Sequence, residues 1–353
     1  MTRNTATQGR LTRAQLLAPV EQLPRERFAH LPTPLEDAPR LRAALGPDAP
    51  RLLIKRDDQT GLSFGGNKVR HLEFRLADIR QRGADTITIM NAAVSNHARL
   101  HTALAARFGL EAFILKVPSG KDAPVNGNLL LDHMMGANIV EASSDDPEVL
   151  KREYRGMLDR LEAEGRTVYD TVNDSFSTIA GTCAYLVGAV EILEQLESRG
   201  ARADHVFVVS GASAAGLVLA GKLLGESFHV HGINVGDQVD PWDLIRNFAS
   251  QTSTHLGFDV QITNDDFSAY TEYGMPGYAQ PSAATMEAIR LAATTEALIF
   301  DPVYTGKSFA AVVDKVRRGE IGVEETVVFI HSGGTPNPFS YGEELMEFLG
   351  QSR

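Results

Sequence analysis

The sequence has little cysteine, no excess of positive charge and no long apolar run, and each absence argues against a class of protein. Cys183 is the single cysteine among 353 residues, so the chain cannot form an internal disulfide and its fold does not depend on an oxidising compartment. The formal net charge of −11 disfavours broad binding to nucleic acid or to anionic membranes, which require clustered Lys and Arg. A local basic pocket for one phosphate is compatible with that charge.

Signals for export, membrane insertion and metal binding are also missing. The first 27 residues carry positive charges but no apolar stretch of signal-peptide length, and no segment offers about 18 uninterrupted apolar residues. The ten histidines and the single cysteine show no recognisable ligand spacing. We therefore expect a cytoplasmic protein with no membrane span, no nucleic-acid partner and no metal site.

The hydrophobic content of 43% and charged content of 22% are those of an ordinary soluble globular protein, long enough for two lobes. Short β-branched runs predict buried strands at Leu52 to Lys55, Thr86 to Met90, Ala112 to Val117, Asn138 to Glu141, Val206 to Ser210, Val230 to Val235 and Thr326 to His331. Apolar residues at three- and four-residue spacing predict helices at Asp78 to Gln81, His97 to Phe108, Pro147 to Glu164, Thr178 to Leu196, Ala283 to Ala293 and Phe309 to Arg317. This alternation indicates parallel sheets, whose ligands bind beyond the C-terminal strand ends.

The loop Gly61 to Arg70 places a lysine after a glycine pair and before a helical run. Gly65 and Gly66 permit backbone conformations closed to other residues, and Lys68 then projects from a helix N-terminus. The positive helix end disfavours the cationic amine, which favours nucleophilic attack on an aldehyde. A surface turn with a solvated lysine is the alternative for this loop taken alone.

Three further loops follow predicted strands. Ser95 is placed to cap a helix, and Asn96 beside it could bind a ligand. The segment from Ser210 to Gly216 has the strand-to-helix arrangement that holds a phosphate, although close packing explains its glycines equally well. Ser332 before two glycines offers a neutral hydroxyl to a ring nitrogen, or is simply a turn.

Together and in this order, the loops resemble fold-type-II enzymes that use pyridoxal 5′-phosphate (PLP), in the group of D-cysteine desulfhydrase and 1-aminocyclopropane-1-carboxylate (ACC) deaminase. The likeness covers His30 to Tyr341 and is carried by LPTPLE at Leu31 to Glu36, IKRDD at Ile54 to Asp58, GGNK at Gly65 to Lys68, SNH at Ser95 to His97, YGMP at Tyr273 to Pro276, DPVYTGKS at Asp301 to Ser308 and HSGG at His331 to Gly334. It implies an α/β fold, tryptophan synthase β-like, with two lobes that each hold a mostly parallel twisted sheet flanked by helices. It also implies a large PLP-binding domain of residues 1–70 and 176–353, a small domain of residues 71–175, and a homodimer.

The same resemblance assigns the site residues. Lys68 is expected to hold PLP and to move the substrate Cα proton, and the catalytic set is Lys68, Ser95, Tyr273 and Tyr304. The cofactor set is Lys68, Asn67, Asn96, Ser210, Gly211, Ala212, Ser213, Ala214, Thr305 and Ser332, where Ser332 or Thr305 partners the pyridine nitrogen. The substrate set is Ser95, Asn96, His97, Tyr273 and Tyr304, and Asp57 and Arg70 are expected to be structural.

Three departures from the family pattern bear on the substrate. Val94 replaces the usual glutamine before SNH, which predicts a less polar pocket wall. The phosphate loop is less glycine-rich than usual, and residues 173–178 replace a Gly-Gly-Ser or Gly-Cys-Ser turn. The first hypothesis is a lyase that performs β-elimination on a small amino acid, like D-cysteine desulfhydrase. A sulfo-lyase that acts on cysteate is a close variant of this hypothesis. Ring-opening ACC deaminase, a β-replacement synthase and a relative without turnover are the alternatives.

Overall fold

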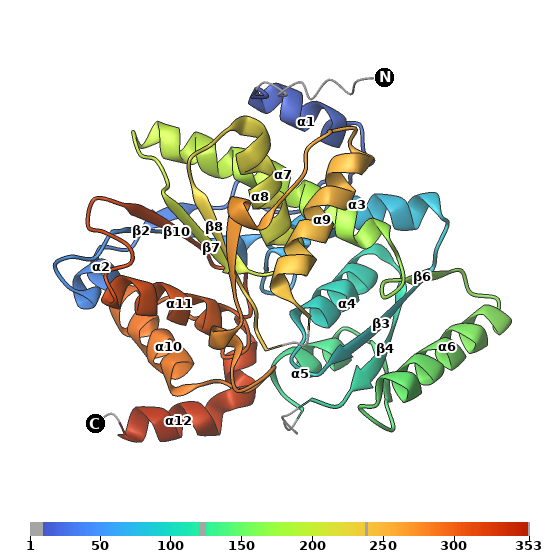
Figure 1. Ribbon diagram of the computed structural model, residues 1–353. Coiled ribbons are helices and arrows are strands. Elements are labelled where there is room, and N and C mark those ends of the chain that lie inside the picture. The colour runs from blue at the N-terminus through green and yellow to red at the C-terminus, as the bar shows by residue number, and fades with distance from the viewer. Residues whose placement is uncertain (1–9, 120–124, 237–238, 352–353) are drawn as a thin grey trace.

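The computed structural model describes residues 10–119, 125–236 and 239–351, which form two sheets flanked by helices (Figure 1). The larger sheet has the strand order β1-β2-β10-β7-β8-β9, with bounds β1 Leu35–Asp37, β2 Arg51–Lys55, β10 Thr326–Ile330, β7 His205–Val209, β8 His229–Ile233 and β9 Phe267–Tyr270. All neighbours pair in parallel except β1, which runs antiparallel to β2. The larger sheet therefore joins strands from both ends of the chain.

The smaller sheet is wholly parallel and comes from one continuous stretch. Its order is β5-β4-β3-β6, with bounds β5 Asn138–Glu141, β4 Glu111–Val117, β3 Thr86–Ala92 and β6 Val168–Asp170. The helices are α1 Arg13–Glu21, α2 Pro39–Leu45, α3 Lys68–Gln81, α4 Asn96–Phe108, α5 Gly127–Met134, α6 Pro147–Ala163, α7 Phe176–Ser198, α8 Ala212–Leu224, α9 Pro241–His255, α10 Ala283–Glu296, α11 Thr305–Arg317 and α12 Gly342–Gln351. The expected α/β architecture with mostly parallel sheets is confirmed.

The seven predicted strands are all present within two residues of their expected ends. The strands without a sequence signal are β1, β6 and β9, which have only three or four residues and lie at sheet edges. We propose that the domains follow the sheets, with residues 71–175 around the smaller one. The helix α3 crosses that boundary, so it connects the two parts.

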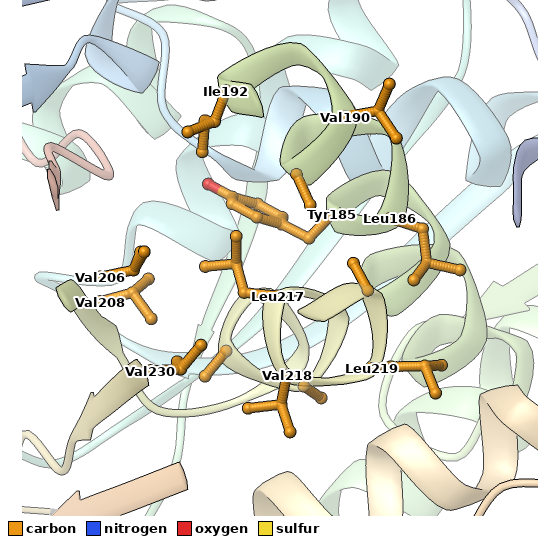
Figure 2. Packing of buried hydrophobic residues seen from close by; sticks show 14 of the residues in the cluster. Tyr185, Leu186, Val190, Ile192, Val206, Val208, Leu217, Val218, Leu219 and Val230 are labelled. Atoms are coloured by element: carbon orange, nitrogen blue, oxygen red, sulfur yellow. The ribbon is translucent and has the colours of Figure 1, made fainter. Parts of the chain in front are cut away.

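The larger sheet is covered on both faces. Alternate residues of β7 point to opposite sides, so Val206 and Val208 pack with α7 and α8 while Phe207 packs with α10 and α11. Figure 2 shows the first of these layers, in which side chains of α7 and α8 lie beside Val206, Val208 and Val230. By length and composition α7 could cross a membrane, but 67% of its most apolar stretch is buried inside the protein, as expected of a core helix.

Two features fix the helices that border the site. A Cβ on Gly216 of α8 would lie 2.5 Å from the Thr182 carbonyl oxygen, so this glycine lets α8 cross close to α7. The buried Arg70 of α3 donates to Asp57 at 2.9 Å and to Glu191 of α7 at 2.8 and 2.9 Å. The expectation that Asp57 and Arg70 are structural agrees with this network, which ties α3 to α7.

Candidate active site

A cavity of about 450 Å³ lies where strands from both sheets end. Its wall includes residues at or just after the C-terminal ends of β3, β6, β7, β8 and β10, namely Asn91, Thr171, Ser210, Val235 and Ser332. The N-terminal turns of α3, α4, α7 and α8 also contribute to the wall. This is the position at which parallel sheets bind ligands.

Lys68 is the first residue of α3 and lines the cavity. The preceding turn depends on Gly65, which has φ +64°, because a Cβ there would lie 2.1 Å from the Asp58 carbonyl oxygen. The Lys68 Nζ lies 5.8 Å from the ring centre of Tyr304. Burial, together with the nearby Arg99 charge, lowers the pKa of Lys68 to about 8, so the neutral amine is accessible near physiological pH.

The N-terminus of α8 faces the cavity without a side-chain cap. After β7, Gly211 adopts φ +126° and α8 begins at Ala212, so its first backbone N–H groups have no intrahelical acceptor. Ser213 Oγ accepts from Asn67 Nδ2 at 2.9 Å, and the buried Ser210 Oγ has no partner among the described residues. Free N–H groups at a positive helix end, beside the unpaired Ser210 hydroxyl, suit a phosphate.

This region differs from expectation in one respect. Residues 212–216 belong to the helix rather than to a loop, and Ala214 is buried in the α7–α8 core and does not line the cavity. Ser210, Gly211, Ala212 and Ser213 do line it.

The Ser95–His97 segment forms the start of α4 at the cavity wall. Ser95 Oγ accepts from Ala98 N at 3.2 Å, as a capping residue should, and donates to Asn91 Oδ1 at 2.5 Å. Asn96 Oδ1 accepts from Asn128 Nδ2 at 2.9 Å, which orients the Asn96 amide with its NH₂ group as the remaining donor. His97 also lines the cavity.

The expectation that Tyr273 faces the site is corrected. Its hydroxyl donates to Asp314 of α11 at 2.7 Å, and its ring packs with the core between the larger sheet and α10 and α11. Tyr278, five residues later, lines the cavity instead, and its hydroxyl lies 2.5 Å from that of Tyr304. Because burial raises the pKa of Tyr304 well above its usual value, this phenol stays protonated at neutral pH.

Thr305 and Val94 are also placed differently from expectation. The Thr305 hydroxyl donates to Asp301 Oδ1 at 2.7 Å at the start of α11 and does not line the cavity, whereas Ser332 does. The Val94 side chain packs in a small apolar cluster with Val303 and Tyr341, so it does not make a cavity wall less polar. The replacement at position 94 therefore acts, if at all, through that cluster.

The sequence reasoning missed several cavity residues. His71 and Arg75 lie three and seven positions after Lys68, a spacing that places them on the same face of α3. That spacing could have identified them, because Lys68 was expected to lie at the N-terminus of a helix. The others are Met90, Asn91, Thr171, Val172, Val209, Val235, Phe248 and Tyr278, whereas Ser177 and Thr178 belong to the segment 173–178 that was expected to bear on the substrate.

The residues of the cavity fit PLP. Lys68 supplies an amine with a lowered pKa, the α8 N-terminus supplies donors for a phosphate, and Ser332 supplies a neutral hydroxyl. Asn67 and Asn96 stand between these groups at the starts of α3 and α4. When bound, PLP withdraws electrons from the substrate Cα, a chemistry that the protein residues do not supply themselves.

Comparisons with known proteins agree with this fit. A D-cysteine desulfhydrase from Salmonella typhimurium is 34% identical over 332 residues, which cover 91% of this chain and 97% of that protein. A Pyrococcus abyssi protein provisionally named ACC deaminase is 34% identical over 333 residues, covering 94% of this chain and 97% of the relative. The crystal structure of an ACC deaminase homologue superposes with a TM-score of 0.83 at 31% identity, covering 94% of this chain and 98% of that one.

The similarity extends through both sheets and every loop that borders the cavity. The family model for "pyridoxal-phosphate dependent enzyme" matches residues 27–333, from before β1 to just beyond Ser332. A lysine amine, an uncapped helix and a neutral hydroxyl thus meet at one cavity within the matched residues, and the chain belongs to the PLP-dependent enzymes of fold type II, among the lyases.

Proposed function

We propose that the protein removes the Cα proton of a small amino acid and expels the substituent on Cβ, giving pyruvate, ammonia and the released group. The observation that carries this proposal is Lys68, whose amine lines the cavity with a pKa lowered to about 8. An amine with such a pKa exchanges a proton efficiently near neutral pH. Relatives named D-cysteine desulfhydrase, at 34% identity, support elimination at Cβ.

The other cavity residues divide into binding and proton-transfer roles. The start of α4, with Ser95 at its cap and Asn96 as the first residue, is suited to the substrate α-carboxylate because helix N-termini bind anions. Tyr304 lies beside Lys68 and is kept protonated by burial, so it is suited to protonate a leaving group. Ser332 is proposed as the partner of the pyridine nitrogen.

Ring-opening deamination of ACC is the second candidate. The observation that favours it is the pair of Tyr278 and Tyr304, whose hydroxyl oxygens lie 2.5 Å apart at the cavity wall. A hydrogen-bonded phenol pair can supply a nucleophile or a proton donor to a ring carbon. The ACC deaminase homologue with a TM-score of 0.83 has the same overall fold.

Product analysis separates the two candidates. Purified enzyme with PLP should be given D-cysteine, L-cysteine, β-chloroalanine and ACC, with pyruvate, 2-oxobutyrate and ammonia measured. Elimination yields pyruvate, and ring opening yields 2-oxobutyrate. We expect pyruvate from at least one β-substituted amino acid with kcat/KM of about 10⁴ M⁻¹s⁻¹ or more. Turnover of ACC alone would reject β-elimination as the main activity.

Two properties of the whole enzyme belong to the same proposal. We propose a homodimer, as the family resemblance implies, and a location in the cytoplasm, since the fold uses no disulfide and its single cysteine is buried. Light scattering coupled to size-exclusion chromatography tests the dimer directly.

A further inference from the structure

Arg75 lines the cavity two helical turns beyond Lys68, on the same face of α3 as His71. Its side chain is almost fully buried, with 4% exposure, so its charge lies inside the protein rather than in bulk solvent. A buried guanidinium on a cavity wall needs a partner for its charge.

The hydrogen bond that Arg75 makes is to a neutral group. Its Nη1 lies 2.6 Å from His101 Nε2, and His101 Nδ1 lies 2.8 Å from the carbonyl oxygen of His97. Since a carbonyl only accepts, Nδ1 carries the ring proton, and Nε2 accepts from the arginine. Burial, with the charge of Arg75, holds the pKa of His101 well below its usual value, so this imidazole orients the guanidinium without balancing its charge.

Carboxylates near this end of α3 are already bound. Asp78 and Asp174 attract Arg75 electrostatically, but both pair with Arg82, at 2.7 and 3.0 Å, and both lie within hydrogen-bond distance of the Tyr169 hydroxyl. Within residues 10–119, 125–236 and 239–351, Arg75 forms no ion pair and its Nε has no hydrogen-bond partner. Arg70, on the same helix and 1% exposed, is bound by two carboxylates.

The neighbouring histidines do not offer a metal site. His71 and His97 line the cavity with Arg75, and burial lowers the pKa of both well below the usual range. In the part of the chain that the structure describes, no group of three or more His, Cys, Asp and Glu side chains could hold a metal ion. The cluster therefore combines one permanent positive charge with neutral donors and acceptors, which is the composition of an anion site.

This anion site is separate from the two already assigned. His71 lies at the phosphate-binding side, since a Cβ on Gly181 would meet both His71 Nδ1 at 3.1 Å and the Ala212 Cβ at 2.7 Å. Arg75 is one turn further along α3 and is bonded to the middle of α4, on the side of the smaller sheet. The α-carboxylate position at the start of α4 lies one turn before His101.

We propose that Arg75, oriented by His101, binds a second anionic group on the substrate, so that the preferred substrate is a small amino acid with a sulfonate or phosphate at Cβ. The identity of the substrate as an amino acid rests on the function proposed above. For cysteate, Lys68 accepts the Cα proton, the Cβ–S bond breaks, and sulfite leaves with the electron pair. Water then converts the remaining three-carbon enamine to pyruvate and ammonium, and no oxidant or reductant is needed.

Binding of a non-reacting anion tests the site without catalysis. The probe is 3-sulfopropionate, which lacks the amine, and its neutral isostere is 4,4-dimethylpentanoate; both are titrated calorimetrically into the PLP-loaded enzyme. We expect the wild type to bind the sulfonate at least ~30-fold more tightly than the isostere, because losing one partner of a buried charge pair has effects of this order. Arg75→Leu should abolish the difference, and Arg75→Lys should retain part of it.

The matched control is Arg80→Leu, because Arg80 lies on the same helix as Arg75 but forms an exposed ion pair with Glu26. It should bind the sulfonate like the wild type. If the wild type shows no preference for the sulfonate, or if Arg80→Leu and Arg75→Leu behave alike, the proposal is overturned.

Turnover measurements distinguish a site for a second substrate anion from a site for the α-carboxylate or for the cofactor phosphate. With both enantiomers of cysteate and of β-chloroalanine, Arg75→Leu should lower kcat/KM for cysteate about 30-fold or more and leave β-chloroalanine within about threefold. An equal loss for both substrates would assign Arg75 to the α-carboxylate, and weaker PLP binding would assign it to the cofactor phosphate; either overturns the proposal. Arg75-dependent binding of 3-sulfopropionate without any elimination would reject the proposed function and leave the anion site standing.

Melting temperature separates this role from a structural one. Replacing an unpaired buried charge with an apolar side chain is neutral or stabilising, so Arg75→Leu should melt at or above the wild-type temperature. A fall of several degrees together with an unchanged preference for the sulfonate would identify Arg75 as a structural residue and overturn the proposal.

Discussion

At the scale of single residues, Lys68 combines a helix-start position with a lowered pKa. Its neighbours on the cavity wall come from both sheets, so the amine lies where cofactor and substrate must meet. The lysines at 55 and 307 are instead buried in hydrogen bonds to protein groups, as shown by Lys55 with Glu191 at 2.5 Å and Lys307 with Gly274 at 2.7 Å. Lys68 is therefore the lysine suited to attack a carbonyl group.

Lys68→Ala should remove the visible absorbance band that the covalent link to PLP produces, while the protein stays folded. Borohydride reduction of the wild type, followed by peptide mapping, should place the label on Lys68. The far-ultraviolet circular dichroism of the variant controls for folding. A label on Lys55 or Lys307 would assign the cofactor link to another residue.

Tyr304 and Tyr273 provide a matched pair, because one hydroxyl lines the cavity and the other is bonded to Asp314. Tyr304→Phe should lower kcat about 100-fold or more, since it removes a proton donor from the reacting centre. Tyr273→Phe should change kcat less than about threefold by the same reasoning. Steady-state kinetics with the best substrate measures both, and a larger loss for Tyr273→Phe would contradict the structure.

The tyrosines also show what residue-level reasoning from sequence could not determine. Tyr273 and Tyr278 both follow β9, and between them lie two glycines and a proline within positions 274–277. Such a turn has no periodicity, so its sequence does not reveal which ring turns inward. The orientation of the Val94 side chain could not be determined for a related reason, because a residue next to a catalytic segment can still point into an apolar core.

At the scale of elements, the N-terminus of α8 depends on the backbone of Gly211. The φ of +126° is outside the range that L residues adopt readily, although no atom lies within 4 Å of a Cβ built there. Gly211→Ala should therefore disturb the turn through backbone strain rather than through a clash. We expect PLP affinity to fall about tenfold, for a strain of roughly 1–3 kcal/mol, measured by absorbance titration.

Gly46 is the control for that experiment. It has φ +119°, would also leave a Cβ with no atom within 4 Å, and ends α2 outside the cavity lining. Gly46→Ala should lower stability by a similar amount and leave PLP affinity unchanged. Equal PLP affinity in the two variants would mean that the α8 turn does not hold the cofactor.

The ion network that joins β2, α3 and α7 should make stability depend on acid. Burial alone would raise the pKa of Asp57, but Arg70 and Lys55 outweigh it and lower the value from 3.8 to about 2. A carboxyl group with a depressed folded-state pKa contributes stability above its unfolded pKa and loses it as the pH falls. The PLP-free protein should therefore lose about 2 kcal/mol of unfolding free energy between about pH 5 and 2 from this group.

Urea unfolding across that pH range measures the effect. Asp57→Asn should be less stable at neutral pH and should show a shallower loss on acidification. Asp159→Asn is the control, because Asp159 forms an exposed i,i+4 pair with Arg155 and contributes little. An unchanged acid slope in Asp57→Asn would show that other carboxyl groups determine acid stability.

The elements themselves were predictable where they are buried. Inner strands such as β7 and β10 have neighbours on both sides and helices on both faces, so their sequences are continuous apolar runs. The edge strands β1, β6 and β9 pair on one side only and showed no β-branched run, whereas the equally short edge strand β5 was predicted from Ile139 and Val140. The start of α8 was misplaced because Ala and Ser at 212–215 give no apolar periodicity, and the helix there is set by packing against α7.

At the scale of the whole molecule, the cofactor cavity is shared between the two sheets. PLP bound to Lys68, the α8 turn and the α4 start connects all of these parts, so binding should stabilise the complete fold. At a cofactor concentration of about 1,000 times Kd, the gain is about 4 kcal/mol. We expect the melting temperature to rise by roughly 5 °C or more on adding PLP.

Scanning calorimetry of the PLP-free and PLP-loaded protein provides the measurement. Lys68→Ala should show a smaller shift, since its binding lacks the covalent link. Two separate transitions of which only one moves with PLP would contradict a cavity built by both sheets.

The pairing of β2 with β10 also constrains the order in which the chain can be made and folded. The strand β2, at residues 51–55, cannot pair with β10 until residues 326–330 have been synthesised. All strands of the smaller sheet, in contrast, are present once residue 170 has been made. At about 5–20 residues per second, the ribosome needs roughly 10–30 s more to reach β10. During that interval the edge of β2 that later pairs with β10 is open, and an open strand edge can pair with other chains. Folding of this enzyme can thus begin with the smaller sheet, in the middle of the chain, and ends when β10 pairs with β2.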